Sequence, residues 1–384
     1  MFTLRQYLLA LLDSRGLTRT LGEIDVCRDE QGRPCFSAGN SAAVFRIRLG
    51  GRIRSLRCYL RPMRHLKEIY GQRLLEKELY LHTSPETGVW VDTVLGDWIE
   101  GSTLHETVAQ AAALRDRECL QILVRLFDRL ALALVTDDRA HGDLKPENII
   151  VGDDGTLCPI DFDASYLPAF AGEISPELGT AAYQHPARTA ADFDERIDDY
   201  PAALISTALH ALAEAPTLWD RYGSSDGLLY TPQRIASDPA YRETLALFEK
   251  RGMAVQYRIA QLLTAPTLRL FGLAELLAEA VREKPAARSG TEAETPELFV
   301  ENGRWGYRTA ERVVVAPLYD NGFDFTEGLA AVLLTSSGEL KALILIAAIF
   351  IVSAIGFRLI FSKNDPAEDA SSPEPEEKQE EPHE

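Results

Sequence analysis

The sequence feature that most restricts the fold is a polar segment in the middle of the chain, His-Gly-Asp-Leu-Lys-Pro-Glu-Asn at residues 141–148. It follows residues 114–135, a leucine-rich stretch whose spacing predicts a helix. Residues 149–160 come next and predict a small hairpin, and Asp161 stands at its end. The sequence therefore predicts a loop of acidic, basic and amide side chains held between a helix and a hairpin.

The rest of the sequence changes from strand patterns to helix patterns along the chain. Strand patterns occupy residues 22–62 and 90–99, and helix patterns occupy residues 64–82 and 198–283. Within the first region, two alternating runs flank Gly50-Gly51, which is a hairpin signal. Strands followed by helices predict an α+β fold with a small β-rich N-lobe and a helical C-lobe, rather than a doubly wound sheet.

Composition and charge narrow the classes of partner. The chain has 384 residues, enough for two or three parts, and its net charge of -18 argues against nucleic acid as a partner. Its five cysteines form no Cys-x-x-Cys pair, which favours free thiols in a reducing cytosol. Residues 1–21 predict an amphipathic helix rather than a signal peptide, because the apolar run is short and ends at Asp13.

The C-terminal region changes character three times. Proline, glycine and charged residues mark residues 284–297 as a linker, and residues 298–340 return to strand patterns. Residues 342–361 are almost entirely apolar, which predicts a single transmembrane helix; a buried core helix is the alternative. Residues 362–384 then form an acidic tail that holds much of the negative excess.

Four residues of the central region suit phosphoryl transfer, which needs positioning and charge stabilisation more than covalent chemistry. Asp143 can accept a hydrogen bond from an attacking hydroxyl, and Lys145 can neutralise charge on the moving phosphoryl group. Asn148 and Asp161 offer the hard oxygen ligands that Mg²⁺ prefers. These residues are the candidate catalytic pair and the candidate metal ligands.

The segment 141–148 resembles the catalytic loop of protein kinases of the serine/threonine type, with Gly142 where most members have arginine. Asp161-Phe162-Asp163 is similar to their metal-binding Asp-Phe-Gly motif, and residues 179–186 are similar to the end of their activation segment. Asp198 stands where the family has a buried aspartate that braces the catalytic loop. The resemblance covers about residues 22–283 and implies a bilobal kinase-like domain that uses ATP and Mg²⁺.

The N-terminal half of the resemblance departs further from the family. Residues 37–44 align with the glycine-rich loop but keep only Gly39 and Val44. Arg57 takes the place of the phosphate-binding lysine; arginine keeps the charge with a different geometry. Glu76, on the helix predicted to follow, is the candidate ion-pair partner of Arg57, or else a solvated surface charge.

The resemblance also supplies candidate contacts for the nucleotide base, because Asp97 and Ile99 lie in a stretch similar to the kinase hinge. The departures leave two other readings open. Arg57 and Asp163 allow a pseudokinase scaffold that binds nucleotide weakly or not at all. Gly142 and Asp163 also occur in the motifs of aminoglycoside-type small-molecule kinases, although residues 179–186 resemble a platform for peptide substrates. Gly142 also removes the usual receptor for an activation-loop phosphate.

Residues 298–340 contain motifs that resemble one unit of the WG-repeat family, among them Asn302-Gly303-Arg304-Trp305-Gly306 and Phe325-Thr326-Glu327-Gly328. A single unit of a repeat architecture buries little surface, so a structural role is expected, with a protein partner as the alternative. The apolar span at residues 342–361 predicts a single-pass membrane protein, and since ATP is cytosolic, the kinase resemblance implies that its kinase domain is cytoplasmic. The protein substrate is not specified by the sequence.

Overall fold

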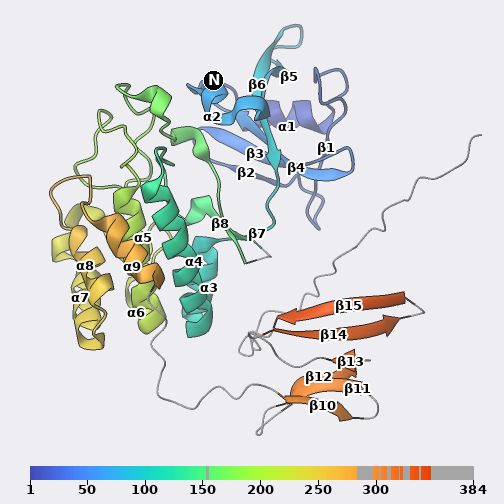
Figure 1. Ribbon diagram of the computed structural model, residues 1–384. Coiled ribbons are helices and arrows are strands. Elements are labelled where there is room, and N and C mark those ends of the chain that lie inside the picture. The colour runs from blue at the N-terminus through green and yellow to red at the C-terminus, as the bar shows by residue number, and fades with distance from the viewer. Residues whose placement is uncertain are drawn as a thin grey trace, which may run out of the picture. The chain divides into compact units, whose positions relative to one another are not determined.

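The computed structural model describes residues 1–152, 155–282, 297–301, 304–308, 313–319, 321–322, 329–336 and 339–346. The chain divides into two compact units, Met1–Ala287 and Arg288–Glu384. In the first unit a sheet-rich N-lobe precedes a helical C-lobe, which is the predicted α+β order (Figure 1).

The N-lobe is built on a six-stranded sheet in the order β1-β3-β4-β6-β5, with β2 paired to β3. Its elements are α1 (Leu4–Leu12), β1 (Asp25–Val26), β2 (Phe36–Ala38), β3 (Ala42–Leu49), β4 (Arg52–Tyr59), α2 (Leu66–Tyr70), the 3-10 turn η1 (Gly71–Arg73), β5 (Leu74–His82) and β6 (Gly88–Asp97). The hairpin predicted around Gly50-Gly51 is confirmed: both glycines have positive φ, as a tight two-residue hairpin turn requires. Alternation along β3 and β4 buries Phe45, Ile47 and Leu56.

The N-terminal helix belongs to this lobe. A capping box between Thr3 and Gln6 starts α1, which ends at Leu12 and is therefore shorter than the helix predicted over residues 1–21. Its buried face joins the apolar core of the sheet, and the hydroxyl of Tyr7 donates a 2.7 Å hydrogen bond to the carbonyl of Tyr59 on β4. The helix thus covers one face of the sheet instead of standing apart from it.

The helix predicted over residues 64–82 is wrong for most of its length. Only α2 and η1 are helical, and from Leu74 onward the chain forms β5, paired to β6. Leu79 and Leu81 point into the core with almost no exposure, at the two-residue spacing of a strand. Just before Leu79, the buried carboxylate of Glu78 accepts the backbone N–H groups of Arg19, Thr20 and Leu21.

The C-lobe follows the predicted order closely. Its elements are β7 (Gly101–Thr103), α3 (Leu104–Ala113), α4 (Arg117–Thr136), η2 (Pro146–Asn148), β8 (Ile149–Gly152), β9 (Leu157–Pro159), η3 (Phe162–Ala164), η4 (Pro168–Phe170), α5 (Asp199–Glu214), α6 (Leu218–Tyr222), η5 (Pro232–Ser237), α7 (Pro239–Arg251), α8 (Ala254–Leu262) and α9 (Leu273–Arg282). The small hairpin is confirmed as β8 and β9, and β7 completes a three-stranded sheet. Helix α5 is buried along nearly its whole length, so it forms the centre of the lobe.

The described residues of the second unit form two three-stranded antiparallel sheets, in the orders β10-β11-β12 and β13-β14-β15. Their strands are β10 (Glu297–Glu301), β11 (Arg304–Arg308), β12 (Val313–Tyr319), β13 (Asn321–Gly322), β14 (Leu329–Ser336) and β15 (Glu339–Ile346). The strand character predicted for residues 298–340 is therefore confirmed where the chain is described. The WG-repeat resemblance stays a prediction.

The predicted transmembrane helix over residues 342–361 differs from the structure at its start. Residues 342–346 lie in β15, where Leu343 pairs with Val332 of β14. Residues 347–361, the acidic tail 362–384 and all of the linker 284–297 except Glu297 lie outside the described residues. Among the helices that the structure describes, none is long and apolar enough to cross a bilayer.

Candidate active site

One buried carboxylate, that of Asp198, fixes the backbone at the start of the polar loop at residues 141–148. Asp198, at the N-terminal end of α5, accepts the backbone N–H of His141 at 2.5 Å and that of Gly142 at 3.0 Å. Burial raises the pKa of Asp198, and the charge of His141 together with these two N–H groups opposes that rise. The brace predicted for Asp198 is therefore confirmed.

Gly142 is required by the backbone of this loop. Its φ is +81°, and a Cβ at this position would lie 2.0 Å from the carbonyl oxygen of Ala164. An arginine would not fit here. The carbonyl of Gly142 instead accepts a 3.0 Å hydrogen bond from Arg188, a buried residue that also donates to Gln184. Sequence reasoning missed Arg188, because an arginine after a proline in a loop carries no signal of burial.

The structure brings the predicted catalytic residues together. The Asp143 carboxylate accepts the backbone N–H of Thr180 at 2.6 Å and the side-chain amide of Asn148 at 3.2 Å. Lys145 Nζ lies 3.6 Å from the same carboxylate and donates to the Thr180 hydroxyl at 2.9 Å. The loop at residues 141–148 and the segment that contains Thr180 therefore meet at Asp143.

Asp161 and Asn148 are joined through the backbone, because the N–H of Ile160 donates to the carbonyl of Asn148 at 2.8 Å. The Asn148 amide nitrogen faces Asp143, which leaves its oxygen for another partner. The Asp161 side chain is 40% exposed. The described residues hold no cluster of three His, Cys, Asp or Glu side chains that could bind a metal. One carboxylate and one amide oxygen suit Mg²⁺, which completes its shell with water and phosphate oxygens.

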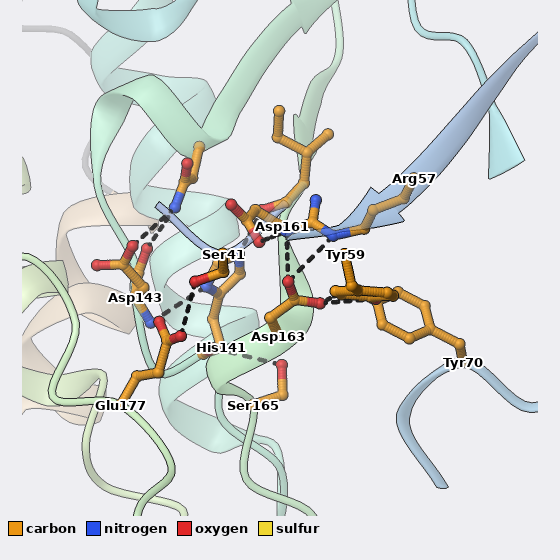
Figure 2. A network of polar contacts seen from close by, with 12 residues as sticks. Ser41, Arg57, Tyr59, Tyr70, His141, Asp143, Asp161, Asp163, Ser165 and Glu177 are labelled. Atoms are coloured by element: carbon orange, nitrogen blue, oxygen red, sulfur yellow. Dashed lines mark hydrogen bonds and ion pairs between the residues drawn. The ribbon is translucent and has the colours of Figure 1, made fainter. Parts of the chain in front are cut away.

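Arg57 lies between two carboxylates in Figure 2, where Asp161 and Asp163 approach its guanidinium. Asp163 accepts from Arg57 Nε at 3.0 Å and from Nη2 at 2.5 Å. Its second oxygen accepts the hydroxyls of Tyr70 at 2.6 Å and Tyr59 at 3.1 Å. Burial alone lowers the pKa of Arg57, but the two carboxylates outweigh it and raise that pKa above its usual range.

The predicted pairing of Glu76 with Arg57 is wrong. Glu76 lies on the strand β5, and its carboxylate contacts Lys67 at 3.3 Å, with both side chains largely exposed. The register of β5 against β6 shifts between Leu75 and Leu79, so Glu76 lies in an irregular part of the strand. The described N-lobe provides no acidic partner for Arg57, and Asp163 of the C-lobe takes that place.

The remaining candidate residues lie on the β2–β3 hairpin and at the end of β6. Residues 37–44 form the β2–β3 hairpin, closed by a 2.9 Å hydrogen bond from the N–H of Gly39 to the carbonyl of Ala42. Val44 is the register partner of Arg57, so the two side chains share one face of the sheet. Asp97 ends β6, and its carbonyl accepts the hydroxyl of Ser55 at 3.1 Å. Ile99 follows in the connection to β7.

The hairpin turn also contacts the C-lobe. The hydroxyl of Ser41 donates to Glu177 at 2.9 Å (Figure 2), and Arg61 donates to both residues. A second contact joins the N-lobe to the residues before Glu177: His65 Nε2 lies 3.0 Å from the carboxylate of Glu173. These contacts hold the segment before Thr180 against the N-lobe.

Comparison with curated proteins finds similarity to protein kinases. The chain is 28% identical over 172 residues to CBL-interacting protein kinase 17 of Oryza sativa subsp. japonica, which covers 42% of this chain and 35% of that protein. It is also 28% identical over 219 residues to serine/threonine-protein kinase PknL of Mycobacterium tuberculosis, which covers 52% of each chain. The chain thus spans about half the length, or less, of these relatives. No protein-family model matches it. The similarities support a protein-kinase-like superfamily and a role in protein phosphotransfer at a coarse level.

Proposed function

We propose that this protein transfers the γ-phosphoryl group of ATP, with Mg²⁺, to serine or threonine hydroxyls of a protein substrate. The observation that carries the proposal is the convergence of Asp143, Lys145 and Asn148 on one loop. Asp161 is linked to that loop through the backbone of Ile160. The similarity to serine/threonine kinases supports the same chemistry.

Each side chain has a role that follows from its position. Asp143 accepts the hydrogen bond of the substrate hydroxyl and orients its oxygen toward the phosphoryl group, and Lys145 offsets the charge that develops there. Asn148 and Asp161 would hold Mg²⁺, which supplies charge stabilisation at the phosphates when it is bound. Arg57 lies on the nucleotide side and offers a forked cation for phosphate oxygens.

A protein substrate is favoured by the segment that precedes Thr180. Ile174 and Leu178 are apolar yet 59% and 47% exposed, and they stand six and two residues before Thr180, which contacts Asp143 and Lys145. Exposed apolar side chains beside a reaction centre offer contact area to a polypeptide. A small-molecule acceptor would not need that surface.

The test uses the full chain with γ-labelled ATP, Mg²⁺ and a generic protein acceptor. Asp143→Asn should lower the initial rate of label transfer about 10²- to 10⁴-fold, because the amide keeps an acceptor for the N–H of Thr180 but loses the basic carboxylate. Asp138→Asn is the matched control, since its side chain is 80% exposed on the preceding turn, and it should retain the wild-type rate.

Two outcomes would contradict the proposal. A wild-type chain that binds ATP but is as inert as Asp143→Asn would favour a pseudokinase scaffold, a reading motivated by the pairing of Arg57 with the candidate metal ligand Asp161. Transfer of label to an aminoglycoside, but to no protein, would favour a small-molecule phosphotransferase.

A further inference from the structure

The contacts of Arg57 divide into one that is exposed and one that is buried. Asp161, the candidate metal ligand, is 40% exposed at its side chain and meets the guanidinium at the edge of the site. Asp163 is only 4% exposed and receives two nitrogens of Arg57. Figure 2 shows both carboxylates converging on this arginine from the C-lobe side.

We propose that Asp163 is the positioning residue that fixes Arg57 for contact with the phosphates of the nucleotide. This inference rests on the proposed function, because it takes ATP as the ligand. Asp163 acts through Arg57 and not on the phosphates, since its own oxygens are already occupied by Arg57, Tyr59 and Tyr70.

The first argument is that no acidic residue of the described N-lobe pairs with Arg57. The acidic residues that follow β4 are engaged elsewhere or exposed: Glu76 pairs with Lys67, Glu78 accepts three backbone N–H groups of the N-terminal segment, and Glu68 lies on the surface. The Arg57 side chain is only 13% exposed, so its charge needs an acidic partner to offset desolvation.

The second argument is that Asp163 is itself rigidly held. The hydroxyls of Tyr59 and Tyr70 donate to one of its oxygens, which leaves the other for Arg57. Burial raises the pKa of both tyrosines, so they stay protonated and remain donors. A carboxylate fixed by two neutral donors holds a fork-shaped cation in one orientation.

The third argument concerns the two carboxylates together. Asp161 accepts one hydrogen bond from Arg57 and its side chain is 40% exposed, so it can turn toward a metal ion and leave the arginine. Asp163 keeps Arg57 in place when that happens, because its contacts do not involve Asp161. The arrangement therefore separates the residue that holds the cation from the residue that binds the metal.

The experiment is a double-mutant cycle on the affinity for ATP, measured by calorimetry on the full chain with Mg²⁺. We expect Asp163→Asn to raise the Kd about tenfold, a change of about 1.4 kcal/mol, and Arg57→Met to raise it by at least as much. The double variant should bind no more weakly than Arg57→Met alone, because Asp163 has no effect once the arginine is gone. Tyr70→Phe, which keeps both charges, should raise the Kd about two- to threefold only when Arg57 is present.

Affinity distinguishes positioning from a purely structural role. If the losses from Asp163→Asn and Arg57→Met multiply to about a hundredfold in the double variant, or if Asp163→Asn and Tyr70→Phe both leave the Kd unchanged, the inference is wrong. Should Asp163→Asn fail to fold, Tyr70→Phe with and without Arg57→Met gives the same comparison. A wild-type chain that binds ATP without transferring phosphate overturns the proposed function alone; one that binds no ATP overturns both.

Discussion

Replacing Gly142 by alanine tests whether the catalytic loop depends on close backbone packing. The new Cβ would lie 2.0 Å from the carbonyl oxygen of Ala164, and this backbone does not move freely. Reciprocal hydrogen bonds between Ala140 and Tyr166, of 3.1 and 2.9 Å, fix one side of the contact, and the Asp198 brace fixes the other. Relief of the clash therefore has to break part of this network.

The cost can be worked from those contacts. Alanine at positive φ costs roughly 1–2 kcal/mol by itself. Loss of one neutral hydrogen bond and of the charged bond to Asp198 adds about 2–4 kcal/mol. We therefore expect Gly142→Ala to lower the free energy of unfolding by about 3–6 kcal/mol.

Urea denaturation of the full chain measures this change, with Gly252→Ala as the matched control. Gly252 ends α7 at a φ of +69°, and a Cβ there meets no atom within 4 Å, so only the cost of positive φ, about 1–2 kcal/mol, applies. If the two variants lose the same stability to within about 1 kcal/mol, the contact with Ala164 is not a constraint on the loop.

Two further stability predictions follow from buried carboxylates. Glu78→Ala should lower the free energy of unfolding by about 2–4 kcal/mol, because three backbone N–H groups lose their acceptor. Glu76→Ala on the same strand is the control and should change it by less than about 1 kcal/mol. Chemical denaturation measures both, and equal losses would refute the role assigned to Glu78. Burial raises the pKa of Asp199 to about 6, so its ionised form destabilises the fold at neutral pH and protonation removes that cost as pH falls from 7 toward 4. The stability of Asp199→Asn relative to wild type should therefore be greater at pH 7 than at pH 4, by on the order of 2–3 kcal/mol, and a difference that does not vary with pH would contradict this.

The sequence predicted secondary structure correctly where one local signal dominated. The glycine pair at 50–51 and the alternation beside it predict β3 and β4, and the leucine spacing of residues 114–135 predicts a helix where the structure has α4 (Arg117–Thr136). The catalytic loop was also predictable, because its chemistry depends on near neighbours along the chain. Asp143, Lys145 and Asn148 lie within one turn-forming segment that has little freedom to separate them.

The secondary-structure prediction failed where composition favoured a helix but burial against the sheet required a strand. Residues 74–82 are rich in Glu, Lys and Leu, which favour a helix, but burial of Leu79 and Leu81 against β6 decides for a strand. That error placed Glu76 beside Arg57. The true partner, Asp163, is separated from Arg57 by 106 residues in sequence, and no local pattern indicates such a contact.

The pairing of Arg57 with Asp163, instead of with an acidic residue of the N-lobe, has a consequence for recognising related chains. When the carboxylate that holds the candidate phosphate-binding cation lies two residues after the candidate metal ligand, the segment between β4 and β5 no longer needs a long helix to present one, and here it is reduced to α2 and η1. In homologous sequences we expect the residue types at positions 57 and 163 to vary together, and those around position 76 to vary independently of them. A search built on that pair would group chains that a search for a helix glutamate would discard.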